Sequence, residues 1–193
     1  MRRVGAPPPF VLGIADLPSV TLILGGARSG KSRYAEALIE GVATNGLYLA
    51  TATAGDREMA QRIRHHRERR GPFWTTIEEP LHLAHALETH ALPGRPILVD
   101  CLTLWLSNLM EAGRSVDSEL ERLVSTIEDL PVPVVLVANE VGQGIVPDNA
   151  LARRFRDHAG RVNQRIAGIA ERVVMMVAGV AMAVKGEDAR RPS

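Results

Sequence analysis

The sequence has one cysteine and no apolar stretch long enough to cross a bilayer. A single cysteine, Cys101, cannot form an internal disulfide or supply a zinc ribbon, and it fits a reducing compartment, so we expect a cytoplasmic protein. The longest apolar run covers residues 173–184 and is interrupted by Gly179, which makes it too short for a transmembrane helix. Prolines at positions 7 to 9 stand where a secretion signal would need a helix, so we expect no signal peptide.

The net charge is also close to zero, and lysine is rare. The chain has 23 basic and 22 acidic side chains, a net charge of +1, and therefore no global electrostatic attraction to nucleic acid. Its 193 residues are 46% hydrophobic, which suffices to bury a core and excludes disorder as the main state. Only Lys31 and Lys185 are lysines, so a lysine within a motif stands out against an arginine-rich background.

Short apolar runs alternate with amphipathic segments along most of the chain. Buried strands are predicted at residues 20–24, 47–50, 97–101 and 132–138, with an extended piece at 74–77 and a last strand led in by 172–177. Helices are predicted at residues 32–40, 56–70, 81–90, 102–111, 117–130 and 151–171. In the last helix one apolar stripe is expected to face the core, namely Leu151, Phe155, Ala159, Val162, Ile166 and Ile169. The alternation predicts an α/β fold whose central, largely parallel sheet is flanked by helices.

The most specific motif joins the first predicted strand to the first predicted helix. It matches the pattern G-x-x-x-x-G-K-[ST] and consists of Gly25, Gly26, Ala27, Arg28, Ser29, Gly30, Lys31 and Ser32. Its glycines let the backbone N–H groups point at phosphate oxygens, Lys31 would reach the β- and γ-phosphates, and the Ser32 hydroxyl would ligate Mg²⁺. We therefore predict a P-loop NTPase: a single nucleotide-binding catalytic domain over 19–185, between an irregular N-terminal extension (1–18) and a C-terminal tail (186–193).

A second candidate, Asp100, ends the apolar strand predicted at 97–101. A carboxylate at the end of a strand beside a P-loop is typical of the Walker B position, which holds the magnesium shell. The alternative is that Asp100 caps the helix that follows. Cys101 next to it fits buried packing better than a nucleophile, because nothing nearby in the sequence favours a thiolate.

The third candidate, His65, falls in the predicted helix 56–70. On a helix, Met59, Ile63 and His66 share an apolar face, whereas Glu58, Arg62, His65 and Arg69 share a polar one. His65 would therefore stand among arginines, where a polyphosphate could lie, and a histidine there can act as a general base or as a nucleophile towards phosphorus. Without further context a solvated surface histidine remains the alternative.

Several motifs together resemble one enzyme family. They are TLILGGARSGKSRYAEAL, YLAT, D-x-E-M-x-x-R-I-x-x-H-H, W-T-T-I-E-E-P, VLVANEVGQGIVP and LARRFRDHAGRVNQRIA. The chain is similar over about residues 20–185 to the bifunctional adenosylcobinamide kinase / adenosylcobinamide-phosphate guanylyltransferase family of cobalamin synthesis. The extension before Ser19 departs from the family pattern.

The resemblance implies a fold, two reactions and a set of site residues. The fold would be a RecA-like P-loop fold, usually assembled as a homo-oligomer, typically a trimer. The enzyme would phosphorylate adenosylcobinamide with ATP or GTP, then transfer GMP from GTP to adenosylcobinamide phosphate, releasing pyrophosphate, with Mg²⁺ as cofactor. His65 corresponds to the histidine that carries GMP covalently. The other implied nucleotide contacts are Glu78, Asp100 and the loop formed by Ala52, Thr53 and Ala54.

Two other functions fit part of the same sequence. A small-molecule or nucleoside kinase without guanylyl transfer would use the P-loop and Asp100 but gives His65 no role. A P-loop switch ATPase would need a sensor residue and a partner surface, and the sequence indicates neither. Covalent labelling of the protein by GTP would separate these alternatives from the bifunctional enzyme.

Overall fold

Seven strands form one sheet in a computed structural model that describes residues 13–53 and 71–186. The strands are β1 (Val20–Gly25), β2 (Gly46–Ala50), β3 (Trp74–Glu78), β4 (Ile97–Asp100), β5 (Val134–Asn139), β6 (Arg172–Val177) and β7 (Val180–Lys185). The helices are α1 (Lys31–Glu40), α3 (Leu83–His90), α4 (Leu102–Glu111), α5 (Val116–Glu128) and α6 (Ala150–Ile169), preceded by the short 3-10 helix η1 (Ile14–Asp16). The predicted helix 56–70 lies outside the described residues.

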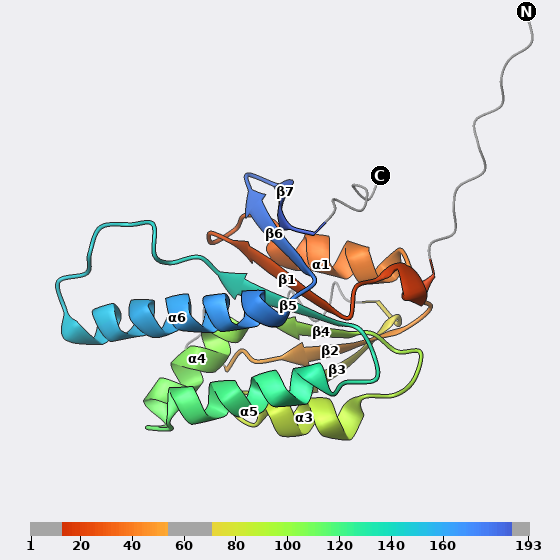
Figure 1. The fold of residues 1–193 in the computed structure, drawn as a ribbon, viewed down its shortest axis with the longest axis horizontal. Coiled ribbons are helices and arrows are strands. Elements are labelled where there is room, and N and C mark those ends of the chain that lie inside the picture. Colours follow the sequence, from red (N-terminus) through yellow and green to blue (C-terminus); the bar gives the residue numbers. More distant parts are fainter. Residues whose placement is uncertain (1–12, 54–70, 187–193) are drawn as a thin grey trace, which may run out of the picture.

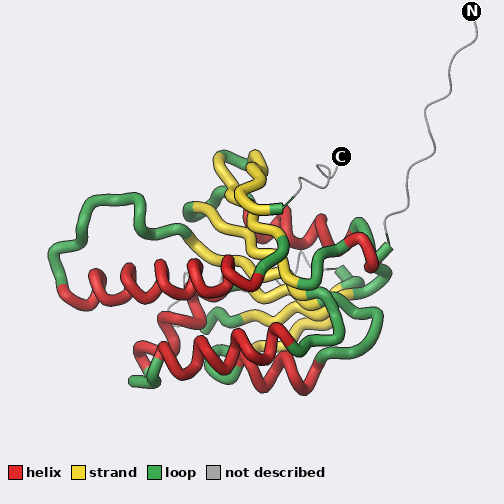
Figure 2. Tube along the Cα trace, viewed as in Figure 1, coloured by secondary structure: helices red, strands yellow, loops and turns green. Residues whose placement is uncertain are grey.

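The strand order is β3-β2-β4-β5-β1-β6-β7, and every neighbouring pair is parallel except β6 and β7. Connections between parallel strands are right-handed, so the direction of travel across the sheet decides which face a helix covers. The chain crosses from β1 to β2 in one direction and returns through β4, β5 and β6 in the other. Accordingly α1 covers one face, and α3, α5 and α6 lie along the opposite face (Figures 1 and 2).

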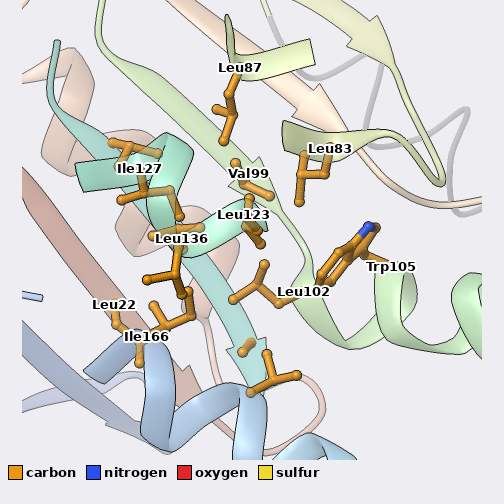
Figure 3. Close-up of a cluster of buried hydrophobic side chains, with 14 of the residues drawn as sticks. Leu22, Leu83, Leu87, Val99, Leu102, Trp105, Leu123, Ile127, Leu136 and Ile166 are labelled. Carbon is orange, nitrogen blue, oxygen red and sulfur yellow. The ribbon is translucent and has the colours of Figure 1, made fainter. Parts of the chain in front are cut away.

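The core consists of two apolar layers, one on each face of the sheet. Side chains alternate along a strand, so the adjacent residues Leu22 and Ile23 of β1 are both fully buried but belong to different layers. The larger layer combines strand residues such as Leu136 with residues of the covering helices such as Trp105 and Ile166 (Figure 3). A fully buried aliphatic side chain stabilises the fold by about 1.5–3 kcal/mol, so this layer anchors α3, α4, α5 and α6 on that face.

The structure confirms the predicted largely parallel sheet and the helices and strands expected within the described residues. One difference is Leu151, which was expected in the apolar stripe but is 59% exposed. The reason is visible in Figure 1, where α6 begins beyond the ends of the strands, so its first turn has no sheet to cover. Within the part of the chain that the structure describes, no helix is long and apolar enough to span a membrane.

A second difference concerns the end of the sheet, where one last strand was predicted and the structure has a hairpin of two strands. Strands β6 and β7 pair antiparallel through a two-residue turn at Ala178 and Gly179, with φ of +50° and +82°. Positive φ at both central residues is the signature of a type I′ turn, which matches the twist of the flanking strands. Because the apolar run continues on both sides of Gly179, this reversal has little signature in the residue pattern.

Candidate nucleotide-binding site

The predicted P-loop lies between β1 and α1 as expected. Gly30 occupies the N-cap of α1 with a φ of +96°, a conformation that L side chains rarely adopt. At Gly25 a Cβ atom would come within 2.5 Å of the Met176 carbonyl oxygen and 2.7 Å of Ser29 Oγ, so only glycine fits there. The two glycines thus allow the sharp turn from strand to helix that directs the loop at the carboxyl edge of the sheet.

Lys31 begins α1, and its side chain reaches back over this loop. Its Nζ donates a hydrogen bond of 2.6 Å to the carbonyl oxygen of Gly26, and the residue is only 7% exposed. Burial lowers the pKa of the ammonium, and the negative charge of Asp100 opposes that shift. The loop therefore holds a largely buried cation beside a carboxylate, an arrangement suited to polyphosphate oxygens.

Asp100 ends β4 at the same edge of the sheet as the P-loop. Strand β5 separates the two, since Val137 pairs with Asp100 and Asn139 pairs with Gly25. The Asp100 carboxylate accepts a 2.6 Å hydrogen bond from the Tyr48 hydroxyl. The residue at the N-cap of α4 is Cys101, so the structure does not support the alternative that Asp100 caps this helix.

Cys101 is packed in the core, as the sequence analysis favoured. It is 6% exposed, and burial, with a further contribution from the Asp100 charge, raises the pKa of the thiol to about 12. Since the thiolate is the nucleophilic form of cysteine, this side chain is not a candidate nucleophile.

The donors available for a metal ion are oxygens. Ser32 occupies the first turn of α1, directly after Lys31, and Asp100 stands at the end of β4. A hydroxyl and a carboxylate beside a phosphate-binding loop are the ligands that Mg²⁺ takes in nucleotide sites, together with phosphate oxygens and water. The residues present therefore fit a magnesium ion.

The other expected nucleotide contacts follow β2 and β3, further along the same edge. Ala50 pairs with Glu78, so Ala52 and Thr53 leave β2 near the point where Glu78 ends β3. The neighbouring Glu79 is committed elsewhere, because its Oε1 accepts hydrogen bonds from the backbone N–H groups of Leu81 and His82. The structure thus brings Ala52, Thr53 and Glu78 into one region, whereas Ala54 and His65 lie outside the described residues.

Two supporting contacts were missed by the sequence analysis. The N–H of Gly179, in the turn of the β6–β7 hairpin, donates to the Ser29 carbonyl oxygen at 3.0 Å, so the hairpin braces the P-loop. Asn108 of α4 is 9% exposed and hydrogen-bonds the segments that follow β2 and β3. The sequence does contain a sign of this contact, because Asn108 is a lone amide on the apolar face that Trp105 and Leu109 define in the helix 102–111.

Comparisons with known proteins identify the family. Residues 21–184 match the family described as cobinamide kinase / cobinamide phosphate guanyltransferase. The chain belongs to this family. The recognition made from the motifs, and the bifunctional enzyme class that it implied, are therefore confirmed at the level of the family.

Individual relatives agree with that assignment. The chain is 52% identical over 171 residues to the bifunctional adenosylcobalamin biosynthesis protein CobP of Pseudomonas aeruginosa, an alignment that covers 86% of this chain and 97% of CobP. It is 45% identical over 179 residues to the bifunctional adenosylcobalamin biosynthesis protein CobU of Salmonella typhimurium, covering 85% of this chain and 98% of CobU.

A solved structure supports the fold alone. An ATPase from the type III secretion system of pathogenic bacteria superposes with a TM-score of 0.51 at 11% sequence identity, covering 86% of this chain and 57% of that one. The predicted α/β P-loop NTPase fold is confirmed.

Proposed function

We propose that this protein phosphorylates adenosylcobinamide with ATP or GTP and then transfers GMP from GTP to the resulting phosphate, giving adenosylcobinamide-GDP and pyrophosphate. The observation that supports it most strongly is the convergence of the P-loop, Asp100 and the Ala52–Thr53 and Glu78 segments at one edge of the sheet, in a member of this family. By the same resemblance we place the enzyme in the cytoplasm as a homo-oligomer, typically a trimer.

In the first reaction the substrate hydroxyl attacks the γ-phosphorus, and the protein supplies binding and charge rather than a nucleophile. The P-loop holds the triphosphate, and Lys31 offsets the negative charge on the oxygens of the transferred group. The Ser32 hydroxyl and the Asp100 carboxylate would hold Mg²⁺, and the ion would supply positive charge that offsets the negative charge of the polyphosphate. The hydrogen bond from Tyr48 fixes one oxygen of the Asp100 carboxylate, so its orientation is set before nucleotide binds.

The second reaction needs a displacement at the α-phosphorus of GTP. We assign the nucleophile to His65: a neutral imidazole nitrogen forms a P–N bond to the α-phosphorus as the bond to pyrophosphate breaks. A phosphate oxygen of adenosylcobinamide phosphate then attacks the same phosphorus, and the P–N bond breaks to release His65. Glu78 would contact the guanine nucleotide during both steps.

The test is the covalent adduct. Protein incubated with GTP and Mg²⁺, without corrinoid, is expected to gain the mass of one GMP, in an acid-labile and base-stable linkage. His65→Ala is expected to lose both this adduct and guanylyl transfer while retaining measurable kinase activity, because the kinase step uses no protein nucleophile.

The neighbouring histidine provides a matched control. His66→Ala removes an imidazole one position away, and we expect it to keep the adduct. An adduct that persists in His65→Ala, or that disappears only in His66→Ala, contradicts the assignment of His65. A wild-type protein that phosphorylates adenosylcobinamide but never acquires GMP is a kinase without guanylyl transfer.

A further inference from the structure

Strands β2 and β3 separate at the carboxyl edge of the sheet, between two segments expected to contact the nucleotide. The last regular contact between them is the hydrogen bond of 2.9 Å from Glu79 N to the Ala50 carbonyl oxygen. One residue beyond that contact on each strand stand the carbonyl groups of Thr51 and Pro80. Both accept hydrogen bonds from the Nδ2 of Asn108, at 2.8 Å and 3.0 Å respectively. One side chain of α4 therefore bridges the two strands where their own pairing ends.

The orientation of the Asn108 amide is fixed by its partners. Carbonyl oxygens only accept, so the two carbonyl groups require the NH₂ group, and the opposite orientation would set three oxygens against one another. The amide oxygen, Oδ1, accepts a hydrogen bond of 3.3 Å from Thr53 Oγ1. Three contacts on two loops thus converge on a side chain that is 9% exposed.

Neighbouring contacts make the two loops rigid on either side of this amide. Trp105, one turn earlier on α4, donates from Nε1 to the Leu81 carbonyl oxygen at 3.0 Å. Thr51 Oγ1 accepts from Cys101 N at 2.8 Å and donates to the Cys101 carbonyl oxygen at 2.7 Å. These contacts fix Thr51 and Leu81 individually, whereas Asn108 links the two loops to each other.

We propose that Asn108 is a positioning residue of the nucleotide site, which sets the separation between the Ala52–Thr53 loop and Glu78. The inference rests on the proposed function, since it takes these two segments as contacts of the guanine nucleotide. Asn108 acts on the loops and touches no substrate. Its loss lets the loops move apart, and this weakens GTP binding while leaving His65 and the P-loop chemically intact.

The experiment measures KM for GTP and kcat in guanylyl transfer for three variants of Asn108. Asn108→Ala removes all three hydrogen bonds, and Asn108→Asp keeps the shape but sets a carboxylate oxygen against two carbonyl oxygens. Each is expected to raise KM for GTP by about tenfold or more, because two buried carbonyl groups lose their partner. Asn108→Ser keeps one donor and is expected to give a KM between those of the wild type and Asn108→Ala. It carries the test if the other two variants fail to fold.

The division between KM and kcat separates positioning from plain destabilisation. A partly unfolded preparation contains less active enzyme, so its kcat falls while its KM stays at the wild-type value. The matched control is Asn163→Ala on α6, which removes another buried helical asparagine, 8% exposed, whose Nδ2 donates to the Asn139 carbonyl oxygen at 3.3 Å. It is expected to lower the unfolding midpoint without the rise in KM.

Two results would overturn the inference: wild-type KM values for GTP in the folded Asn108 variants, or an equal rise in KM in Asn163→Ala. Failure of the proposed function appears differently, because the wild-type protein itself would then form no GMP adduct and show no guanylyl transfer.

Discussion

At the scale of single residues, the P-loop depends on a lysine in a chain that has only one other lysine and otherwise uses arginine for positive charge. Lys31 is held against the Gly26 carbonyl oxygen in a space that leaves it 7% exposed. A compact ammonium on a flexible stem fits such a space, whereas a planar guanidinium needs more room and a different geometry of acceptors. The identity of this cation, and not only its charge, is therefore set by the fold of the loop.

We expect Lys31→Ala to lose both half-reactions by roughly a hundredfold, since a charged contact removed from a phosphate site costs on the order of 3 kcal/mol. Lys31→Arg is expected to fail as well. The control is Lys185→Arg, a change at the other lysine, which is exposed and bonds the backbone of Ala167 and Gly168. The measurement is the rate of the kinase and transfer reactions catalysed by each purified variant. Wild-type turnover by Lys31→Ala would refute the role assigned to the loop.

At the scale of elements, the β6–β7 hairpin contains a local conflict. Ala178 adopts a φ of +50° in its turn, a conformation that costs an L-residue with a Cβ roughly 1 kcal/mol. The turn is nevertheless kept in place, because its next residue, Gly179, bonds the Ser29 carbonyl oxygen of the P-loop. Tertiary contact at the tip thus overrides the preference of the residue that occupies the turn.

Ala178→Asn should relieve this conflict, since Asn-Gly is the preferred pair for a type I′ turn. We expect the free energy of unfolding to rise by about 0.5–1 kcal/mol, measured by urea denaturation. Ala183→Asn places the same side chain in the extended backbone of β7 and should give no gain. Equal effects of the two substitutions would show that the turn conformation is not the cause.

At the scale of the whole molecule, β1 organises the sheet, because it pairs with β5 on one side and β6 on the other. A protein truncated after Ala170 loses β6 and β7, so the P-loop strand would have one neighbour and one bare edge. We expect this protein to show no cooperative urea transition by circular dichroism, whereas a protein ending at Gly186 retains every described strand and should unfold cooperatively. Cooperative unfolding of the shorter protein would contradict this account of the sheet.

Sequence reasoning succeeded where the signal is local and failed where it depends on contacts between distant segments. Buried apolar runs and the glycine-lysine loop predicted the strands and the P-loop, because strand burial and phosphate geometry restrict the residues at each position. A lone amide on an apolar helix face marks Asn108 in the sequence, but its partners could not be predicted, since Thr51 and Pro80 lie 57 and 28 positions away. The exposure of Leu151 likewise depends on where α6 extends past the edge of the sheet, and helical periodicity does not predict that position.

The pairing of β1 also orders events during synthesis. Residues 20–25 leave the ribosome long before residues 172–177, and at about 5–20 residues per second the interval is roughly eight to thirty seconds. Throughout that time the strand that leads into the P-loop lacks one of its neighbours, and the brace from Gly179 does not yet exist. Until residues 172–177 have emerged, β5 is the neighbour available to β1, so early folding of the sheet depends on β1 to β5 and the helices that cover them.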